Sequence, residues 1–444
     1  MKKIAITTLG CKVNQFESAA FATGFEARGC ELVPFQGEAD VYVINTCTVT
    51  AKAGQQSRQL IRRVLNRHPG ARIVVTGCYA QMEPETVLNL AAEPVTIIGN
   101  GNKHLLVETA LAEANPDLVM LMGQIRRKTE ICDLPVRRFK GRTRAYLRIQ
   151  DGCDNFCSYC IVPFTRGRSR SLPLAGVLEQ VEIFAEQGYK ELVITGINVG
   201  KYGLDLAERQ TIYTLLDRIC RGFPQLRIRL SSVELAEVSD CLLELMTTHA
   251  NFMPHLHIPL QSGDDETLAR MNRRYTRAEF AAVISRVRNA LPSAAIGCDV
   301  LAGFPGESEQ AAENTYQLLA DLAVNYLHVF PYSRRPGTLA AAFGHQLPGP
   351  VKEARVQRLR LLDSDKRTRF YRDQVGTVHR VLVERRHAKT GFLQGFSGNY
   401  LPILFPGTTA LLRQVVPVRL TGVDNGQPLG SLVEDFLEEN RGTR

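Results

Sequence analysis

Six strand-like runs alternate with helical segments between residues 140 and 335, and this alternation restricts the fold more than any other feature. The runs are RAYLRIQ (144–150), ELVITG (191–196), RIRLSS (227–232), HLHIPL (255–260), AIGCDVLAG (295–303) and YLHVFPYS (326–333). Parallel strands need a crossover connection, which a helix usually supplies. A complete β/α barrel has about eight such units, so six units predict an incomplete barrel.

Regions of different pattern flank this segment. At the front, KIAITTL, VYVINT, RIVVTG and VTIIGN alternate with helical spacing such as that of QQSRQLIRRVLNR, which predicts a parallel α/β domain. Residues 348–374 form a charged helical connector. The runs GTVHRVLVERR, GFLQGFSGNYLPILF and QVVPVRLTGV after it predict a small β-barrel. The expected fold class is therefore α/β with a C-terminal barrel, and the expected domains are 1–115, 139–370 and 373–438.

The composition indicates a soluble, cytoplasmic protein without membrane association. Hydrophobic residues make up 44% of the chain, and no run approaches the ~20 apolar residues of a membrane-spanning helix. TLGC at positions 8–11 could end a lipoprotein signal, but IAITTL is shorter than the roughly 7–15 apolar residues such a signal needs. The net charge of +9 is only a weak indication of a polyanionic partner.

Three clustered cysteines follow the first strand of the expected barrel. Cys153, Cys157 and Cys160, here called the central triad, have the spacing Cys-x3-Cys-x2-Cys. Clustered cytosolic cysteines indicate metal or redox chemistry rather than disulfides. A [4Fe–4S] cluster usually takes four thiolates, so this loop would leave one iron open. A zinc site and buried structural thiols remain alternatives, although the loop lacks the second cysteine pair typical of zinc.

Three other cysteines each follow a strand-like run and precede a helical one. Cys11, Cys47 and Cys78, here called the N-terminal triad, would emerge at one sheet edge if their strands are parallel neighbours. Open α/β sheets bind ligands at that edge, and three converging thiolates could hold a second cluster. Small buried cysteines are the alternative. The remaining cysteines fit that alternative and receive no function: Cys30, Cys132, Cys220, Cys241 and Cys298.

These motifs resemble the radical S-adenosylmethionine (SAM) superfamily and, over residues 2 to 437, its methylthiotransferase family. The resemblance rests on TLGCKVNQFES, NTCTVT, TGCYAQ, GCDNFCSYCIVPFTRGRSRS and GFPGE. It implies a catalytic [4Fe–4S] cluster on the central triad, with SAM on its open iron. It also implies a second [4Fe–4S] cluster on the N-terminal triad, which provides the inserted sulfur, and a C-terminal TRAM barrel that binds RNA.

Small and polar residues follow the barrel strands at the edge where β/α barrels bind ligands. They offer hydrogen bonds to an amine, a ribose or an adenine, although each could instead cap the next helix. The resemblance makes Gly196 a backbone contact of the SAM amino group, and Leu235 stands where relatives usually have proline. The expected SAM-binding residues are Tyr159, Gly196, Asn198, Ser232, Glu234 and Gln261.

Aromatic and basic residues in the last domain predict RNA contacts, because RNA recognition combines ring stacking with positive charge. Phe392, Phe396 and Tyr400 lie close in sequence to His387 and Lys389. Each ring could instead belong to the barrel core. Three arginines past the central triad are placed to meet phosphates or the cofactor carboxylate, or to form a solvated face; they are Arg166, Arg168 and Arg170.

The signatures CKVN and IQDGC resemble the family branch that acts on N6-threonylcarbamoyladenosine. The resemblance implies that this base, at position 37 of tRNA, becomes its 2-methylthio derivative. A SAM-derived radical removes hydrogen from adenine C2, the second cluster gives sulfur and a second SAM gives the methyl group. The implied partners are the tRNA anticodon stem-loop and a flavodoxin- or ferredoxin-like electron donor; the sulfur donor is unknown. Nothing in the spacing explains why Lys12 and Val13 should select this base.

Two other kinds of function stay open. An RNA-binding iron–sulfur sensor or electron carrier without catalysis would explain both triads and the barrel, but not the polar strand ends. The same chemistry could also act on isopentenyladenosine in tRNA or on an aspartate of a ribosomal protein.

Overall fold

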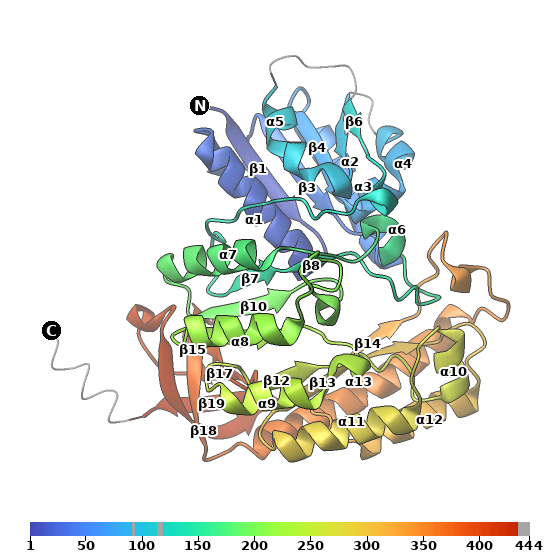
Figure 1. Cartoon of the computed structure of the whole chain (residues 1–444), viewed down its shortest axis with the longest axis vertical. Coiled ribbons are helices and arrows are strands. Elements are labelled where there is room, and N and C mark those ends of the chain that lie inside the picture. The colour runs from blue at the N-terminus through green and yellow to red at the C-terminus, as the bar shows by residue number, and fades with distance from the viewer. Residues whose placement is uncertain (91–93, 113–118, 434–444) are drawn as a thin grey trace.

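The computed structural model describes residues 1–90, 94–112 and 119–433, which form three domains packed in chain order (Figure 1). The N-terminal domain is blue, the partial barrel is green to orange, and the C-terminal barrel is red. The expected domain limits at residues 115 and 438 lie outside the described residues. The first sheet also includes a strand, β6, beyond residue 115.

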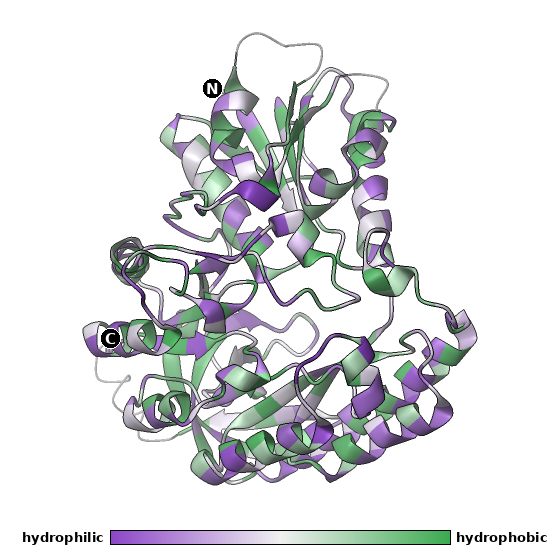
Figure 2. Cartoon of the chain, turned by 45° about the vertical axis from the view of Figure 1, so that its right-hand side comes forward, coloured by the Kyte–Doolittle hydropathy of each residue, from purple (hydrophilic) through white to green (hydrophobic). Residues whose placement is uncertain are grey.

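The N-terminal domain is built on a parallel sheet, as the sequence predicted, and this sheet has six strands in the order β2-β1-β3-β4-β5-β6. Hydrophobic residues are concentrated in its strands (Figure 2), and all of β3 is buried. The sequence pattern missed β2 and β6, because three residues are too few to show a period. The elements are β1 (Lys3–Thr8), β2 (Glu31–Val33), β3 (Val41–Thr46), β4 (Arg72–Gly77), β5 (Thr96–Ile98), β6 (Val119–Leu121), α1 (Lys12–Ala27), α2 (Ala51–Arg67), α3 (Cys78–Met82), α4 (Pro84–Leu88) and α5 (Leu106–Leu111).

The partial barrel contains the six expected strands, paired as two parallel sheets, β11-β10-β7 and β12-β13-β14. A bridge between Ile228 and Phe252 and a hydrogen bond from Val233 N–H to His257 O (3.0 Å) join the sheets. The expected first strand divides into β7 and β8, because β8 turns away to pair with β9. The strands are β7 (Ala145–Arg148), β8 (Gln150–Asp151), β9 (Arg170–Ser171), β10 (Glu191–Thr195), β11 (Arg227–Leu230), β12 (His255–His257), β13 (Ala295–Ala302) and β14 (Tyr326–Pro331).

Helices cover the outside of the partial barrel, and several begin at side-chain caps. Thr276 and Glu279 form a reciprocal capping box at the start of α11, which satisfies backbone N–H groups left open at a helix end. The helices are α6 (Val162–Arg166), α7 (Leu174–Glu186), α8 (Ile212–Gly222), α9 (Asp240–Thr248), α10 (Asp265–Arg270), α11 (Arg277–Ala290) and α12 (Glu309–Asp321). Among the described helices, none combines the length and hydrophobicity that a membrane span requires.

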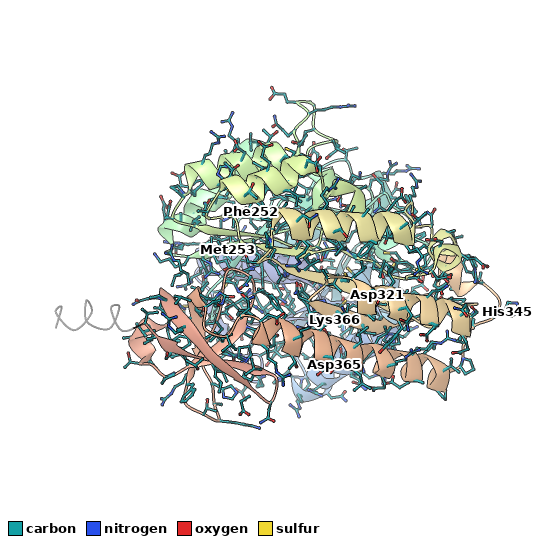
Figure 3. All side chains as sticks on the ribbon, turned by 90° about the horizontal axis from the view of Figure 1, so that it is seen from below. Phe252, Met253, Asp321, His345, Asp365 and Lys366 are labelled. Carbon is teal, nitrogen blue, oxygen red and sulfur yellow. The ribbon has the colours of Figure 1, made fainter. Side chains whose placement is uncertain are left out.

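The charged connector forms helix α13 (Gly349–Arg372), which leads from the partial barrel to the C-terminal barrel. Figure 3 shows α13 beside α12, where Lys366 Nζ donates hydrogen bonds to the carbonyls of Ala320 (3.2 Å) and Leu322 (3.0 Å). The C-terminal strands close into a barrel of order β15-β16-β17-β19-β18, as expected. They are β15 (Val378–Arg386), β16 (Leu393–Phe396), β17 (Pro402–Phe405), β18 (Val415–Asp424) and β19 (Gln427–Leu432).

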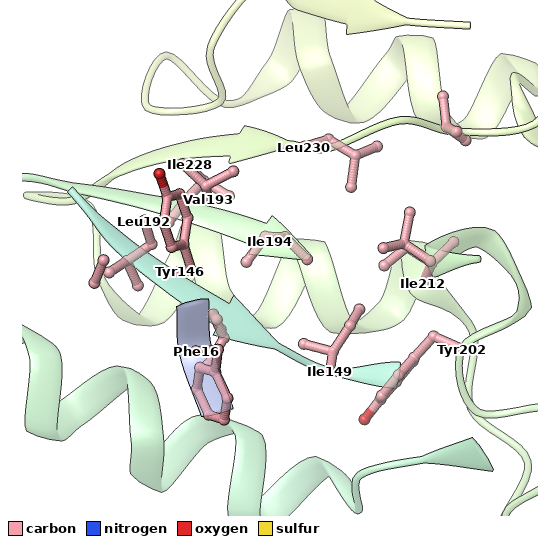
Figure 4. Packing of buried hydrophobic residues seen from close by; sticks show 14 of the residues in the cluster. Phe16, Tyr146, Ile149, Leu192, Val193, Ile194, Tyr202, Ile212, Ile228 and Leu230 are labelled. Atoms are coloured by element: carbon pink, nitrogen blue, oxygen red, sulfur yellow. The ribbon is translucent and has the colours of Figure 1, made fainter. Parts of the chain in front are cut away.

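One hydrophobic core spans the first two domains. Phe16 on α1 is 2% exposed and packs 6.5 Å from Phe139, measured between ring centroids. Figure 4 shows Phe16 beside β7, which carries Tyr146, with Ile149 just after the end of that strand. The N-terminal domain is therefore fixed against the barrel rather than tethered to it.

We expect Phe16→Ala to lower the free energy of unfolding by about 3–5 kcal/mol, because it removes a fully buried ring and leaves a cavity. Leu361→Ala is the control, since Leu361 is 69% exposed and its loss should change stability by about 0.5 kcal/mol or less. Chemical denaturation of the purified chain measures both values. Equal effects of the two substitutions would contradict a shared core.

A single buried carboxylate, that of Glu191, holds several arginines together at the amino ends of β7, β10 and β11, here called the floor of the partial barrel. Glu191 accepts from Arg229 Nε (2.8 Å) and lies 3.1 Å from Arg227 Nε and 3.8 Å from Arg144 Nη1. Arg229 also donates to the carbonyls of Ser397 and Gly398 in the C-terminal barrel. Although burial opposes its charge, Arg229 and Arg227 hold the pKa of Glu191 at about 2. This cluster therefore joins the second and third domains.

The depressed pKa of Glu191 predicts a loss of stability in acid. Its contribution is fully present above the unfolded pKa of about 4.3 and is lost as the pH falls towards 2. Between pH 6 and pH 3 the wild-type chain should lose about 2 kcal/mol more unfolding free energy than Glu191→Gln, whose amide does not titrate. Urea unfolding at the two pH values measures the difference, and parallel losses would contradict it.

Candidate active site

The N-terminal triad converges at one edge of the first sheet. Cys11 follows β1, Cys47 follows β3 and Cys78 follows β4, and these strands are adjacent and parallel. Gly77, with φ of 93°, has no room for a side chain, since a Cβ would lie 2.3 Å from Thr46 O. The sharp turn that this glycine allows brings Cys78 to the edge immediately after the strand.

The Asn14 side chain and the burial of two of the thiols define the surroundings of the N-terminal triad. The Asn14 amide donates to Leu9 O (2.7 Å) and Thr46 O (3.0 Å), and its Oδ1 lies 3.9 Å from Cys11 Sγ. Burial raises the pKa of Cys47 to about 11. Cys11 is accessible to solvent, yet the protein surrounds it closely enough that desolvation raises its pKa as well. The thiols of Cys11 and Cys47 therefore stay protonated at neutral pH until a metal cation displaces the proton.

The central triad lies on the loop between β8 and α6. Cys153 N–H donates to Gly167 O (3.1 Å), Cys160 N–H donates to Cys157 O (2.9 Å), and Asn155 N–H points at Cys153 Sγ (3.4 Å). Burial raises the pKa of Cys153 to about 11 and that of Cys160 to about 12. The loop thus presents three thiols at the carboxyl end of the barrel strands.

The Arg273 guanidinium, which the sequence analysis did not single out, approaches the central triad. Its Nη1 donates to Cys157 Sγ (3.5 Å) and to Glu234 Oε1 (3.1 Å). A cation against a ligand sulfur stabilises the negative charge of a thiolate cluster. The pair Arg-Arg in MNRRYT gives no sequence signal for this role, because only the fold brings it to the cysteine loop.

The spacing within both triads suits a group larger than one ion. Among the described residues, neither triad has all three sulfur atoms within 4.8 Å of one another. Tetrahedral zinc, with bonds of about 2.3 Å, would draw its sulfur ligands to roughly 3.8 Å apart. At least one sulfur–sulfur distance in each triad is therefore wider than a single zinc ion requires.

Asn198, next to the central triad, has a buried polar side chain that is suited to contact a bound cofactor. Asn198 follows β10, and its side-chain amide hydrogen-bonds to Cys153 and favours the ionised form of that thiol, whereas its Oδ1 has no hydrogen-bond partner within the described part of the chain. Gln150 Oε1 accepts from the N–H groups of Ile197 (3.0 Å) and Asn198 (2.8 Å), which holds the turn beside Gly196 in place. A Cβ on Gly196 would lie 2.9 Å from Gln150 Oε1. These features fit a bound SAM.

The other expected SAM-binding residues lie at the same end of the barrel, in different roles. Tyr159 is partly buried against the cluster of Met271 and Phe304. Glu234 is paired with Arg273, and Ser232 is exposed and lines a separate cavity in the barrel interior. Gln261 has a φ of 69°, and its backbone bonds to Asp299 and Leu301 of β13. Tyr159, Gly196 and Asn198 therefore lie by the cysteine loop, whereas Glu234 is already engaged by a cation.

The two triads are joined by a buried ion network. Arg166, at the end of α6, donates to Glu17 Oε1 (3.0 Å), Asp151 Oδ1 (2.9 Å) and Asn14 Oδ1 (2.5 Å). The network sets four cations against two carboxylates, all at most 5% exposed. Its members are Glu17, Lys103, Arg148, Asp151, Arg166 and Arg170.

The excess of positive charge in this network faces the N-terminal triad. The charge of Arg166 favours the ionised form of Cys11. In turn, Cys78 and Cys11 favour the charged form of Arg166 and raise its pKa. The Asn100 amide donates to Thr165 O (2.7 Å) and lies 3.8 Å from Cys78 Sγ. A negatively charged thiolate cluster would balance the surplus cations.

The expected phosphate-binding role of the arginines past the central triad is wrong for two of them. Arg166 and Arg170 are buried in the ion network, where their donors are taken by protein groups. The hydrophilic run concealed this, because their partners come from distant parts of the sequence. Arg168 alone is exposed, and it is paired with Asp154.

The expected aromatic RNA contacts are also only partly available. The rings of Phe396 and Tyr400 stack 4.8 Å apart, and Arg144 lies over both. Arg229 lies 4.7 Å from the Tyr400 ring, so these rings close the floor of the partial barrel. Phe392, at 37% exposed, remains accessible beside His387.

A cavity of about 220 Å³ lies inside the partial barrel. Its walls carry the side chains of Lys12, Arg144, Arg229, Asp299 and Tyr400, so all three domains contribute to it. Burial, with Arg144 and Arg229 nearby, lowers the pKa of Lys12. In the sequence, Lys12 was noted only as part of a signature, because no local pattern shows that a residue of the N-terminal domain lines a cavity in the partial barrel.

Two sequence profiles match the chain. The profile described as Uncharacterized protein family UPF0004 matches residues 3–99, and that of the Radical SAM superfamily matches residues 147–319. The first match contains the N-terminal triad and the second contains the central triad.

Curated relatives cover nearly the whole chain. The threonylcarbamoyladenosine tRNA methylthiotransferase MtaB of Bacillus subtilis (strain 168) is 37% identical over 99% of both chains. The protein of the same name from Aquifex aeolicus (strain VF5) is 38% identical over 86% of this chain and 92% of its own. A tRNA-2-methylthio-N(6)-dimethylallyladenosine synthase of Pelotomaculum thermopropionicum is 32% identical over 99% of both.

Solved structures share the fold at low sequence identity. The radical S-adenosylmethionine methyltransferase TsrM of Kitasatospora setae, with cobalamin and a [4Fe–4S] cluster bound, has a TM-score of 0.56 and 17% identity over 77% of each chain. The cobalamin-dependent radical enzyme OxsB has a TM-score of 0.51 and 12% identity, covering 81% of this chain and 55% of its own.

Arg166→Met should lower the free energy of unfolding by about 3–5 kcal/mol, because it leaves Glu17 and Asp151 short of a buried partner. Arg168→Met is the matched control, and the loss of its exposed ion pair should cost about 1 kcal/mol or less. Urea unfolding of the two variants measures the difference. Similar stabilities would show that the network does not hold the domains together.

Proposed function

The chain belongs to the methylthiotransferase family of radical SAM enzymes, and on this basis we propose that it methylthiolates N6-threonylcarbamoyladenosine beside the tRNA anticodon. Its cofactors are SAM and [4Fe–4S] clusters. The observation that carries the proposal is the pair of cysteine triads, each at the ligand-binding edge of a parallel sheet and joined through Arg166. The relatives named MtaB support the choice of substrate.

When bound, the cofactors supply the difficult steps: reduced cluster and SAM generate a hydrogen-abstracting radical, the second cluster supplies sulfur, and a second SAM supplies the methyl group. The residues of this chain bind and orient. The central triad would hold the catalytic cluster, and the Arg273 guanidinium donates to Cys157 Sγ. Asn198 offers its amide oxygen to SAM from beside Cys153.

The N-terminal triad would hold the second cluster, and the ion network fixes its position relative to the first. Arg166 reaches from the cysteine loop of one domain to Asn14 and Glu17 of the other. Because the network is buried, water does not screen it, and the two domains keep one relative placement. Transfer of sulfur to a substrate radical requires such fixed geometry.

The remaining partners follow from the chemistry. Cluster reduction needs an electron donor of the flavodoxin or ferredoxin type, and the anticodon stem-loop must enter from the side of the triads. The enzyme would act in the cytoplasm, where tRNA is available. The exposed Phe392 and His387 on the C-terminal barrel are candidates for RNA contact.

Anaerobic reconstitution should load about eight irons per chain, four for each triad. A variant with Cys11→Ala, Cys47→Ala and Cys78→Ala should keep about four irons and release 5′-deoxyadenosine, but form no methylthio product. Iron analysis and mass spectrometry of the tRNA nucleosides measure these outcomes. Methylthio product from this variant would exclude the proposed role of the N-terminal triad.

The substrate itself is tested by tRNA nucleosides from a deletion strain. Loss of 2-methylthio-N6-threonylcarbamoyladenosine, with the isopentenyl derivative unchanged, is expected. Loss of the isopentenyl derivative instead would favour the activity named for the Pelotomaculum relative. Failure of the purified, reduced chain to release 5′-deoxyadenosine would favour a sensor or carrier without catalysis.

A further inference from the structure

The cavity inside the partial barrel contains a cation that the protein does not neutralise. Lys12 is half-buried, and its side chain lines this cavity from the start of α1. Within the described parts of the chain, Lys12 Nζ has neither an ion-pair partner nor a hydrogen bond. Removing a lysine ammonium from bulk water without such a partner costs free energy, unless a bound ligand pairs with the charge.

The two other cationic side chains that line the cavity already have partners within the protein. Arg229 makes a two-point contact with Glu191 (2.8 and 3.2 Å) and donates to two backbone carbonyls. Arg144 lies 2.6 Å from Glu384 and donates to the Tyr400 hydroxyl (3.4 Å). These two guanidinium groups build the floor, and Lys12 is left facing the open space.

The carboxylate that lines the cavity, that of Asp299, also has partners within the protein. Asp299 Oδ1 lies 2.8 Å from His257 Nε2 and 3.4 Å from His328 Nδ1. These three side chains have the types and spacing of a metal site. However, the unpaired Lys12 ammonium lines the same cavity, and its repulsion disfavours a divalent cation there. The cavity therefore suits an anion with further polar groups.

The size of the cavity limits its occupant to part of a nucleoside. Sites for drug-sized ligands are roughly 300–1,000 Å³, whereas this cavity is about 220 Å³. A substituent of a base would fill it while the base stayed outside. Lys12 is adjacent in sequence to Cys11, so such a base would lie close to the N-terminal triad.

We infer that Lys12 is a specificity-determining residue that binds the carboxylate of the threonylcarbamoyl group. This inference rests on the proposed function, because it assigns part of that substrate to the barrel cavity. Among the two adenosine substituents in question, the threonylcarbamoyl group carries a carboxylate and the isopentenyl group carries no charge. The unpaired ammonium of Lys12 thus favours the first and is left unsatisfied by the second.

A stem-loop carrying the threonylcarbamoyl group as its neutral amide tests this directly. The reconstituted wild-type chain should use the amide with about tenfold to a hundredfold lower kcat/KM than the acid, the range expected for one charge-assisted hydrogen bond. Lys12→Gln should use acid and amide equally, and Lys12→Arg should retain most of the preference. Stem-loop Kd values should follow the same order, because the carboxylate is already bound before reaction.

Lys190→Gln is the matched control, since Lys190 is exposed and lies outside the cavity, and it should keep the wild-type preference for the acid. Equal use of acid and amide by the wild-type chain, or an unchanged preference in Lys12→Gln, would overturn the assignment of Lys12. The wild-type comparison needs no variant, so it stands even if Lys12→Gln fails to assemble its clusters. Absence of any methylthio product from the acid stem-loop would instead overturn the proposed function.

Discussion

The buried contact of Arg166 with Glu17, Asp151 and Asn14 is the interaction on which the arrangement of the site depends. A buried ion pair gains little stability beyond what a hydrophobic pair would give, but breaking one leaves an uncompensated charge. Such a network tolerates few alternative placements of its members. It therefore fixes the end of α6, and with it the cysteine loop, against the sheet edge that carries the other three thiols.

The interior of the partial barrel is polar, and its stability depends on a second carboxylate. Glu191 engages Arg144, Arg227 and Arg229 at the floor, and Tyr400 of the C-terminal barrel covers that floor from outside the barrel. Most small barrels fill their interior with apolar side chains. Here the charged floor keeps part of the interior open as a cavity, so the third domain contributes to the shape of that cavity.

Much of the fold could be predicted from the sequence, because hydrophobic strand-like runs alternate regularly with helical segments. The strands that carry Cys11, Cys47 and Cys78 were evident from hydrophobic runs, and parallel pairing followed from the alternation with helices. The short strands Glu31–Val33 and Val119–Leu121 could not be recognised, since three residues show no period. Arg166 and Arg170 were misjudged because a charged residue looks the same in sequence whether solvent or a distant carboxylate surrounds it.

The sequence by itself determined which thiols lie together on one loop, because Cys153, Cys157 and Cys160 are close neighbours along the chain whatever surrounds them. Only the tertiary structure decided which groups face one another. Arg273 meets Cys157, Arg166 joins the two triads, and Lys12 enters the barrel cavity because α1 packs against β7. These contacts link residues far apart in the chain, and their energies depend on burial and distance, which no local pattern encodes.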